Sequence, residues 1–266
     1  MTTAGDPWGV HTLSSETVFL RALVGLGISR GEIGKRIRNR WKAKYSTLID
    51  AEIRGIKYRL DISNNPTDEK ILLSSKFKDK KEIDALCAGK LGVFVDVGAN
   101  TGYYTLSCAK RGFQRILSVE ANPTTVSRLS FNVGINPWQD RVTIIPLCVG
   151  GGGKIPFYFS GGLGNASLIK PREDIPPIFV ESKPLFQILS ENSISVIDAM
   201  KIDIEGYEDQ ALLPFFSQAP ETMWPKVVVI EDCHRDEWKR DVLEEMLKIG
   251  YAVKDRTRGN QILIRA

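Results

Sequence analysis

The chain is poor in cysteine. Its 266 residues include four cysteines, Cys87, Cys108, Cys148 and Cys233, and no two of them form a CxxC pair. Their neighbours in the sequence are apolar, so we expect reduced, buried thiols and no disulfide framework. This pattern predicts a cytoplasmic protein.

Long apolar runs and a strong charge of one sign are also missing. No run approaches the ~20 residues that cross a bilayer, and no signal peptide is visible. The 36 Lys and Arg against 32 Asp and Glu give a net charge of +4, which predicts no nucleic-acid partner. The region from Ile28 to Lys44 is strongly basic, with Ile33, Ile37 and Trp41 spaced four apart. Two interpretations stay open: a helix packed on the domain, or peripheral contact with an anionic membrane surface.

A third absence concerns glycine spacing. The apolar run 93–97 predicts a buried strand, and residues 98–102 (Gly-Ala-Asn-Thr-Gly) predict a tight turn before a helix. A dinucleotide fingerprint needs a glycine where Asn100 stands, so a nicotinamide cofactor is disfavoured. The string from Asp96 to Gly102 instead resembles the first motif of S-adenosylmethionine-dependent methyltransferases. The plain alternative is an ordinary turn between a strand and a helix.

Strands and helices alternate along the rest of the chain, which predicts an α/β protein. We expect a Rossmann-like, seven-stranded, mainly parallel sheet with flanking helices, the class I methyltransferase arrangement. A β-hairpin over residues 51–62 and a helix over residues 69–88 precede it. The expected division is an N-terminal extension at residues 1–90 and a cofactor-binding domain at residues 91–266. The predicted strands are residues 93–97, 115–120, 141–147, 196–204, 226–231, 251–253 and 261–264.

Several acids follow predicted strands, where ligands of open α/β sheets bind. Glu120 lies 22 residues after Gly98 and suits the two hydroxyls of a ribose. Asp203 and Glu205 follow a later strand and suit acceptor binding or proton removal, with a structural ion network as the alternative. His234 follows the next strand and is the favoured base, because imidazole takes up a proton near neutral pH. The side chains of Asp203, Glu231, Asp232 and His234 are of the type that holds Mg²⁺ or Mn²⁺, so a metal site stays open as an alternative. Nothing in the spacing demands a metal ion, and none is predicted.

These strings together resemble the FkbM family of S-adenosylmethionine-dependent O-methyltransferases. The similarity includes residues 96–102, residues 201–208 (Lys-Ile-Asp-Ile-Glu-Gly-Tyr-Glu) and residues 165–168 (Asn-Ala-Ser-Leu). The family has Glu-Pro after the second strand, whereas Ala121 and Asn122 intervene here. The resemblance implies S-adenosylmethionine as the cofactor and methylation of a hydroxyl on a sugar, glycolipid or secondary metabolite, hence a small-molecule or glycan acceptor. The expected site residues are Asp96, Gly98, Asn100, Gly102 and Glu120 for the cofactor, Asn165 and Ser167 for the acceptor, and His234, Asp203 and Glu205 for catalysis.

Two other functions remain open at this point. One is an NAD(P)-dependent oxidoreductase, and the other is a non-catalytic module that binds the cofactor or a glycan. The sequence fixes neither the acceptor nor the oligomeric state.

Overall fold

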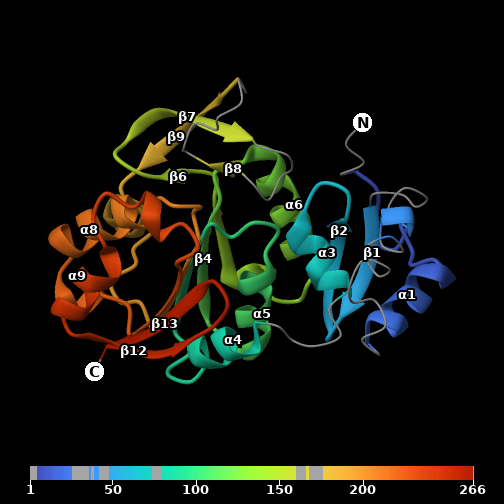
Figure 1. Cartoon of the computed structure of the whole chain (residues 1–266), viewed down its shortest axis with the longest axis horizontal. Coiled ribbons are helices and arrows are strands. Elements are labelled where there is room, and N and C mark those ends of the chain that lie inside the picture. Colours follow the sequence, from blue (N-terminus) through green and yellow to red (C-terminus); the bar gives the residue numbers. More distant parts are fainter. Residues whose placement is uncertain are drawn as a thin grey trace.

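The central element is a seven-stranded sheet, seen edge-on in the middle of Figure 1. The computed structural model describes residues 5–25, 36, 39–41, 48–73, 79–159, 166–167 and 176–265. The strand order is β12-β13-β11-β10-β3-β4-β5, and β13 runs antiparallel to both of its neighbours. The α/β fold and the class I methyltransferase arrangement are therefore confirmed. The strands are β3 (Val93–Val97), β4 (Arg115–Val119), β5 (Val142–Ile145), β10 (Ala199–Ile202), β11 (Val227–Glu231), β12 (Tyr251–Arg256) and β13 (Asn260–Arg265).

Helices cover both faces of this sheet because its strands are apolar on both sides. Val95 and Val97 pack toward one layer of helices, whereas Phe94 packs toward the other, as the two-residue period of a strand requires. The first layer is α7 (Leu185–Glu191), α8 (Glu208–Gln218) and α9 (Val242–Lys248). The second layer is α4 (Lys80–Leu86), α5 (Tyr103–Arg111) and α6 (Pro123–Gly134). Short 3-10 turns lie at Gln139–Arg141, Glu221–Met223 and Arg235–Glu237.

The N-terminal part lies beside α5 and α6, on the blue side of Figure 1. It contains α1 (Ser15–Gly25), β1 (Leu48–Ile53), β2 (Ile56–Asp61) and α3 (Pro66–Leu73). The predicted hairpin is confirmed, with β1 and β2 antiparallel. The helix predicted over residues 69–88 is instead two helices, α3 and α4, with residues 74–78 outside the described part. Leu106 of α5 and Leu129 of α6 share an apolar cluster with the hairpin, so this part is packed on the sheet domain.

A second, smaller sheet rises above the central one (Figure 1). Its four strands, in the order β6-β9-β7-β8, are β6 (Cys148–Val149), β7 (Gly153–Phe159), β8 (Ala166–Ser167) and β9 (Ile178–Lys183). Sequence reasoning missed β9, whose apolar residues Ile178 and Phe179 are exposed and follow no core pattern.

Some predictions fall wholly or largely outside the described residues. From the basic region between Ile28 and Lys44 the structure describes only residue 36 and residues 39–41. From residues 161–177, which include the predicted acceptor residues Asn165 and Ser167, it describes only residues 166–167 and 176–177. Within the described part, none of the helices combines the length and the apolar character needed to cross a membrane.

Candidate active site

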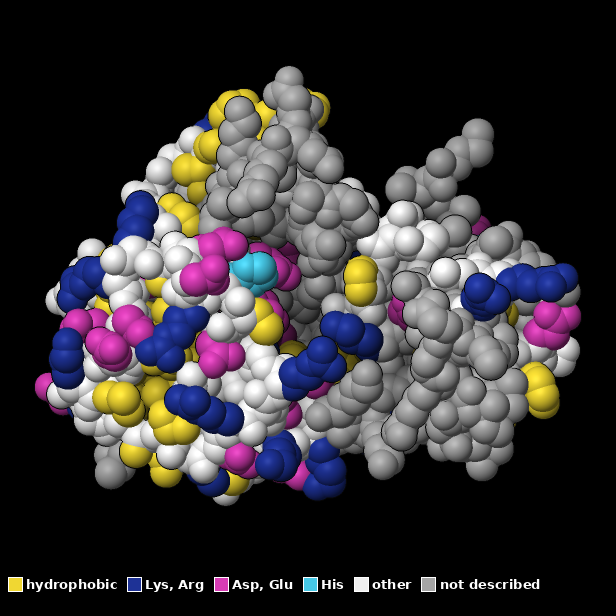
Figure 2. Space-filling view, in the orientation of Figure 1, with side chains coloured by type: hydrophobic (Ala, Val, Ile, Leu, Met, Phe, Trp, Pro, Cys, Tyr) yellow, Lys and Arg dark blue, Asp and Glu magenta, His cyan; other side chains and the backbone are white. Residues whose placement is uncertain are grey.

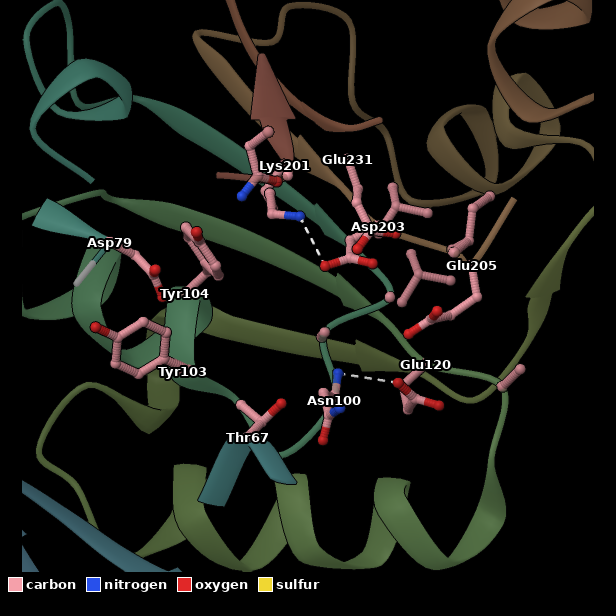
Figure 3. Close-up of a pocket in the computed structure, with 18 of the residues that line it drawn as sticks. Thr67, Asp79, Asn100, Tyr103, Tyr104, Glu120, Lys201, Asp203, Glu205 and Glu231 are labelled. Carbon is pink, nitrogen blue, oxygen red and sulfur yellow. Dashed lines mark hydrogen bonds and ion pairs between the residues drawn. The ribbon is translucent and has the colours of Figure 1, made fainter. Parts of the chain in front are cut away.

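A cavity of about 340 Å³ opens at the carboxyl ends of β3, β4, β10 and β11. Parallel strands present loops and helix N-termini at that edge, which is where α/β sheets bind ligands. Figure 3 shows two groups of polar side chains on its wall. Glu120 and Asn100 lie at one end, and Asp203, Glu205 and Glu231 gather at the other.

The turn after β3 forms the floor of this cavity. Gly98 has a φ of +77°, and a Cβ built there would lie 1.9 Å from the backbone oxygen of Asp203. Only glycine fits between the two loops. The amides of Gly98 and Ala99 donate to the Val119 carbonyl at 2.9 and 3.0 Å, which fixes the turn against β4. Gly102, with a φ of +97°, caps the start of α5 and does not line the cavity.

Glu120 is held by two backbone amides. One carboxylate oxygen accepts from the Asn100 N–H and the other from the Asn122 N–H, each at 2.9 Å. Burial raises the pKa of Glu120, against the pull of these donors. Each oxygen keeps a further lone pair for a ligand. Asn122 also caps α6 by accepting from the Thr124 and Thr125 amides, so the insertion seen in the sequence supports the acid.

The N-terminal part reaches the same turn through α3. The Asn65 side chain donates to the Asn100 side-chain oxygen at 2.8 Å, and the Thr101 hydroxyl donates to Asp68 at 2.7 Å. Asp68 is completely buried and also pairs with Arg128. Burial nevertheless raises the pKa of Asp68. Sequence reasoning missed these positioning residues, because no motif links them to the turn.

Asp96 sits in the core below the turn, not on the cavity wall. Its carboxylate accepts from the Thr105 hydroxyl at 2.6 Å, and burial raises its pKa to about 6. In this structure Asp96 contacts α5 through Thr105 and does not line the cavity. Its predicted cofactor role stays a prediction.

At the opposite end of the cavity from Glu120, the charged side chains surround Lys201. This lysine is 2% exposed, and its ammonium lies 3.0 Å from the Asp203 carboxylate. Burial alone would raise the pKa of Asp203, but Lys201 outweighs it and lowers that pKa. Burial and the negative charges of Asp203 and Glu205 raise the pKa of Glu231 to about 9. At neutral pH Glu231 therefore carries a proton and can donate a hydrogen bond to Asp203.

Glu205 projects from the loop after β10 with a φ of +54°, a strained value for a residue with a side chain. Burial, followed by the nearby Asp203, raises its pKa to about 7. His234 lies 3.1 Å from Glu205 and 3.2 Å from Glu237. Burial would lower the pKa of His234, but these carboxylates raise it. A ring between two acceptors is stabilised in its doubly protonated form.

The predicted site residues thus fall into two groups. Gly98, Asn100, Glu120, Asp203 and Glu205 line one cavity, whereas Asp96, Gly102 and His234 are not part of its wall. Asn165 is outside the described residues, as is the side chain of Ser167, so their acceptor role stays a prediction.

Other residues on the wall were not predicted as site residues. Lys201, Glu231 and Cys233 line the cavity, and Cys233 is an exposed thiol, contrary to the prediction of four buried cysteines. Glu205, Glu231 and His234 bring ligand atoms within 4.8 Å of one another, a set that suits a hard divalent cation. The prediction that no metal is needed stays a prediction.

Comparison with known proteins assigns the family. The model of the FkbM methyltransferase domain matches residues 96–253, which is more than half of the chain. The chain belongs to this family and is an S-adenosylmethionine-dependent methyltransferase. The site fits that cofactor, because Glu120 offers a half-buried carboxylate on the cavity wall, beside the turn at Gly98 that forms the cavity floor.

The individual proteins that resemble this chain match only part of it or share little sequence with it. A protein of Methanocaldococcus jannaschii, named as a candidate N5-glutamine methyltransferase, is 33% identical over 86 residues, or 32% of this chain. The chain covers only 39% of that relative's length. A solved structure named as a candidate rRNA methylase of Clostridium thermocellum is 13% identical, with 72% of this chain and 96% of that chain covered and a TM-score of 0.44. The M. jannaschii protein TYW2, solved with AdoMet, is 14% identical, with 83% and 84% covered and a TM-score of 0.42.

These relatives correct the predicted partners. The exclusion of nucleic acid, based on the mild net charge, is wrong, since one of the similar structures is named for RNA methylation. Net charge averages over the whole chain and does not describe one cavity. The predicted glycan acceptor has no support in the names of these three proteins.

Proposed function

We propose that this methyltransferase transfers its methyl group to a hydroxyl oxygen of the acceptor. The observation that carries the proposal is Glu205, a carboxylate on the cavity wall whose pKa is raised to about 7 by burial and by Asp203. A hydroxyl is a weak nucleophile and gains from a base in the transition state. The best base has a pKa near the working pH, which Glu205 meets.

The two ends of the cavity then have separate tasks. When bound, the cofactor supplies an electrophilic methyl group on a sulfonium centre. Glu120 accepts hydrogen bonds from the ribose hydroxyls, and the turn at Gly98 forms the cavity floor beside it. Much of the rate comes from the alignment of the acceptor with that methyl group.

At the acceptor end, Asp203 and Glu205 divide the work. Lys201 keeps Asp203 ionised, so Asp203 accepts a hydrogen bond and orients the hydroxyl. Glu205 takes the hydroxyl proton as the oxygen attacks. The role predicted for His234 changes in this proposal: it lies behind Glu205, pairs with it and holds its position. Glu205 is the catalytic residue and His234 a positioning residue.

The experiment uses S-adenosylmethionine labelled with ¹³C on the methyl group. The protein is incubated with hydroxyl compounds, glutaminyl peptides and RNA, and the product is examined by NMR, where the carbon shift separates O-methyl from N-methyl. We expect label on oxygen only. A methyl group found on nitrogen or carbon would refute the proposal.

The matched variants are Glu205→Gln and Glu237→Gln. Both remove one carboxylate beside His234, but only Glu205 lines the cavity. Glu205→Gln should lower turnover by about 10²–10⁴-fold, the usual effect of losing a general base. Glu237→Gln should change it by only a few fold, and S-adenosylhomocysteine affinity should stay within about twofold in both. Equal turnover in the two variants would exclude Glu205 as the base.

A further inference from the structure

Two cations line the cavity and have no partner in the described part of the chain. Lys70 comes from α3, and Arg258 comes from the turn between β12 and β13. Both side chains are exposed, and neither makes a hydrogen bond or an ion pair with any residue that the structure describes. Lysine and arginine side chains at a cavity mouth attract an anionic group of a ligand.

Both cations belong to the acceptor end. Lys70 and Asp203 line the same cavity, and the charge of Lys70 adds to that of Lys201 in lowering the pKa of Asp203, against burial, which raises it. Arg258 precedes Gly259, whose carbonyl accepts from the Asp232 amide at 3.1 Å. This bond holds the turn beside the end of β11, where Glu231 lines the cavity.

The surface shows the same division of charge. Figure 2 shows a hollow in the middle of this face, with acidic side chains and a histidine along one edge and lysine or arginine side chains along another. An acceptor that enters there meets carboxylates that handle a hydroxyl and cations that do not pair with them. A neutral acceptor would leave those cations unused.

We propose that Lys70 and Arg258 bind an anionic group, a phosphate or a carboxylate, which the acceptor carries near the hydroxyl to be methylated. This inference rests on the proposed function in one respect, namely that the molecule bound at this end of the cavity is the methyl acceptor. The anion site itself does not depend on which atom is methylated. The one other source of an anion at this cavity is the carboxylate of the cofactor, and the test separates the two.

The test measures binding and needs no turnover. The protein is saturated with S-adenosylhomocysteine and titrated calorimetrically with inorganic phosphate and, separately, with acetate. Lys70→Gln and Arg258→Gln should each weaken anion binding by about 3- to 10-fold, the effect of losing one partly screened ion pair. Their matched controls, Lys254→Gln and Arg256→Gln, remove exposed cations of β12 that do not line the cavity, and they should stay within about twofold.

A second titration compares S-adenosylhomocysteine with 5′-methylthioadenosine, which lacks the amino-acid carboxylate. Affinity for both should be unchanged in Lys70→Gln and Arg258→Gln. If only S-adenosylhomocysteine binds more weakly, the cations hold the cofactor and the proposal fails. It also fails if the saturated wild type binds neither anion, or if the controls weaken binding as much. A methyl group found on nitrogen would refute the proposed O-methylation and leave these binding results standing.

Discussion

Removing the Glu120 carboxylate tests the cofactor end of the site most directly. In the structure its two oxygens each accept one backbone amide at 2.9 Å and face the cavity with their remaining lone pairs. A hydrogen bond to a charged group contributes about 1.5–3 kcal/mol. Glu120→Ala should therefore weaken S-adenosylhomocysteine binding by about one to two orders of magnitude, at 1.4 kcal/mol per tenfold.

The alanine variant also leaves the Asn100 and Asn122 amides without their acceptor, which costs about 1–3 kcal/mol for each amide that stays buried. Glu120→Gln keeps one acceptor oxygen and removes the charge. Comparing it with the alanine variant therefore separates a loss of ligand affinity from a loss of folding stability. Calorimetry gives the affinity, and urea unfolding shows whether each variant is folded under the same conditions. Glu244→Ala, on the exposed side of α9, is the control for a lost surface acid.

The pH dependence of binding gives a second test of the same residue. Burial raises the pKa of Glu120, and the ionised form is the better acceptor. Affinity in the wild type should therefore rise as the pH increases through that pKa, and the rise should disappear in Glu120→Gln. An affinity within twofold of wild type in the folded alanine variant would refute the ribose contact.

Three further predictions concern stability and rate. Gly98→Ala should destabilise the protein by about 2–4 kcal/mol in urea unfolding, since its Cβ meets the Asp203 carbonyl; Gly134→Ala, with no heavy atom within 4 Å of its added Cβ, should not destabilise it. Asp68→Asn should cost about 3–5 kcal/mol, because it leaves the charge of Arg128 without its buried partner, and stability within 1 kcal/mol of wild type would contradict this. Turnover should rise with pH around 7, as the Glu205 carboxyl with its pKa of about 7 loses its proton, and Glu205→Gln should abolish that rise.

The sheet and the cofactor turn could be predicted because their signals are local. Strands 93–97 and 115–119 are short apolar runs that end at a glycine turn or an acid, and burial on both faces demands that composition. The position of Glu120 followed from the same rule, since an acid directly after the second strand must lie beside the turn after the first.

The contributions of the N-terminal part could not be predicted in this way. Asn65 and Asp68 contact Asn100 and Thr101 across more than 30 residues of sequence, and only packing of α3 on the sheet domain brings them together. Strand β9 was missed for a related reason. It buries only two alternate residues and exposes Phe179, so the pattern of a core strand is absent.

The acid end shows where reasoning from the sequence stops. Adjacent parallel strands put Asp203 and Glu231 side by side, because Ile202 pairs with Ile230 in the register of β10 and β11. That much follows from topology. That Glu205 lines the cavity and His234 does not could not be predicted, because it depends on the local conformation of the loop after β10, where Glu205 has a φ of +54°.

One lysine then makes the three acids chemically different. Among the residues that the structure describes, Lys201 forms an ion pair only with Asp203, so Asp203 stays ionised while burial and mutual repulsion raise the pKa of Glu205 to about 7 and that of Glu231 to about 9. Carboxyl groups whose pKa values are spread apart in one cavity can accept a hydrogen bond, take a proton and hold a proton at the same pH. Lys201 is part of the string that carries the family resemblance. Its function becomes visible only when its neighbours across the sheet are known.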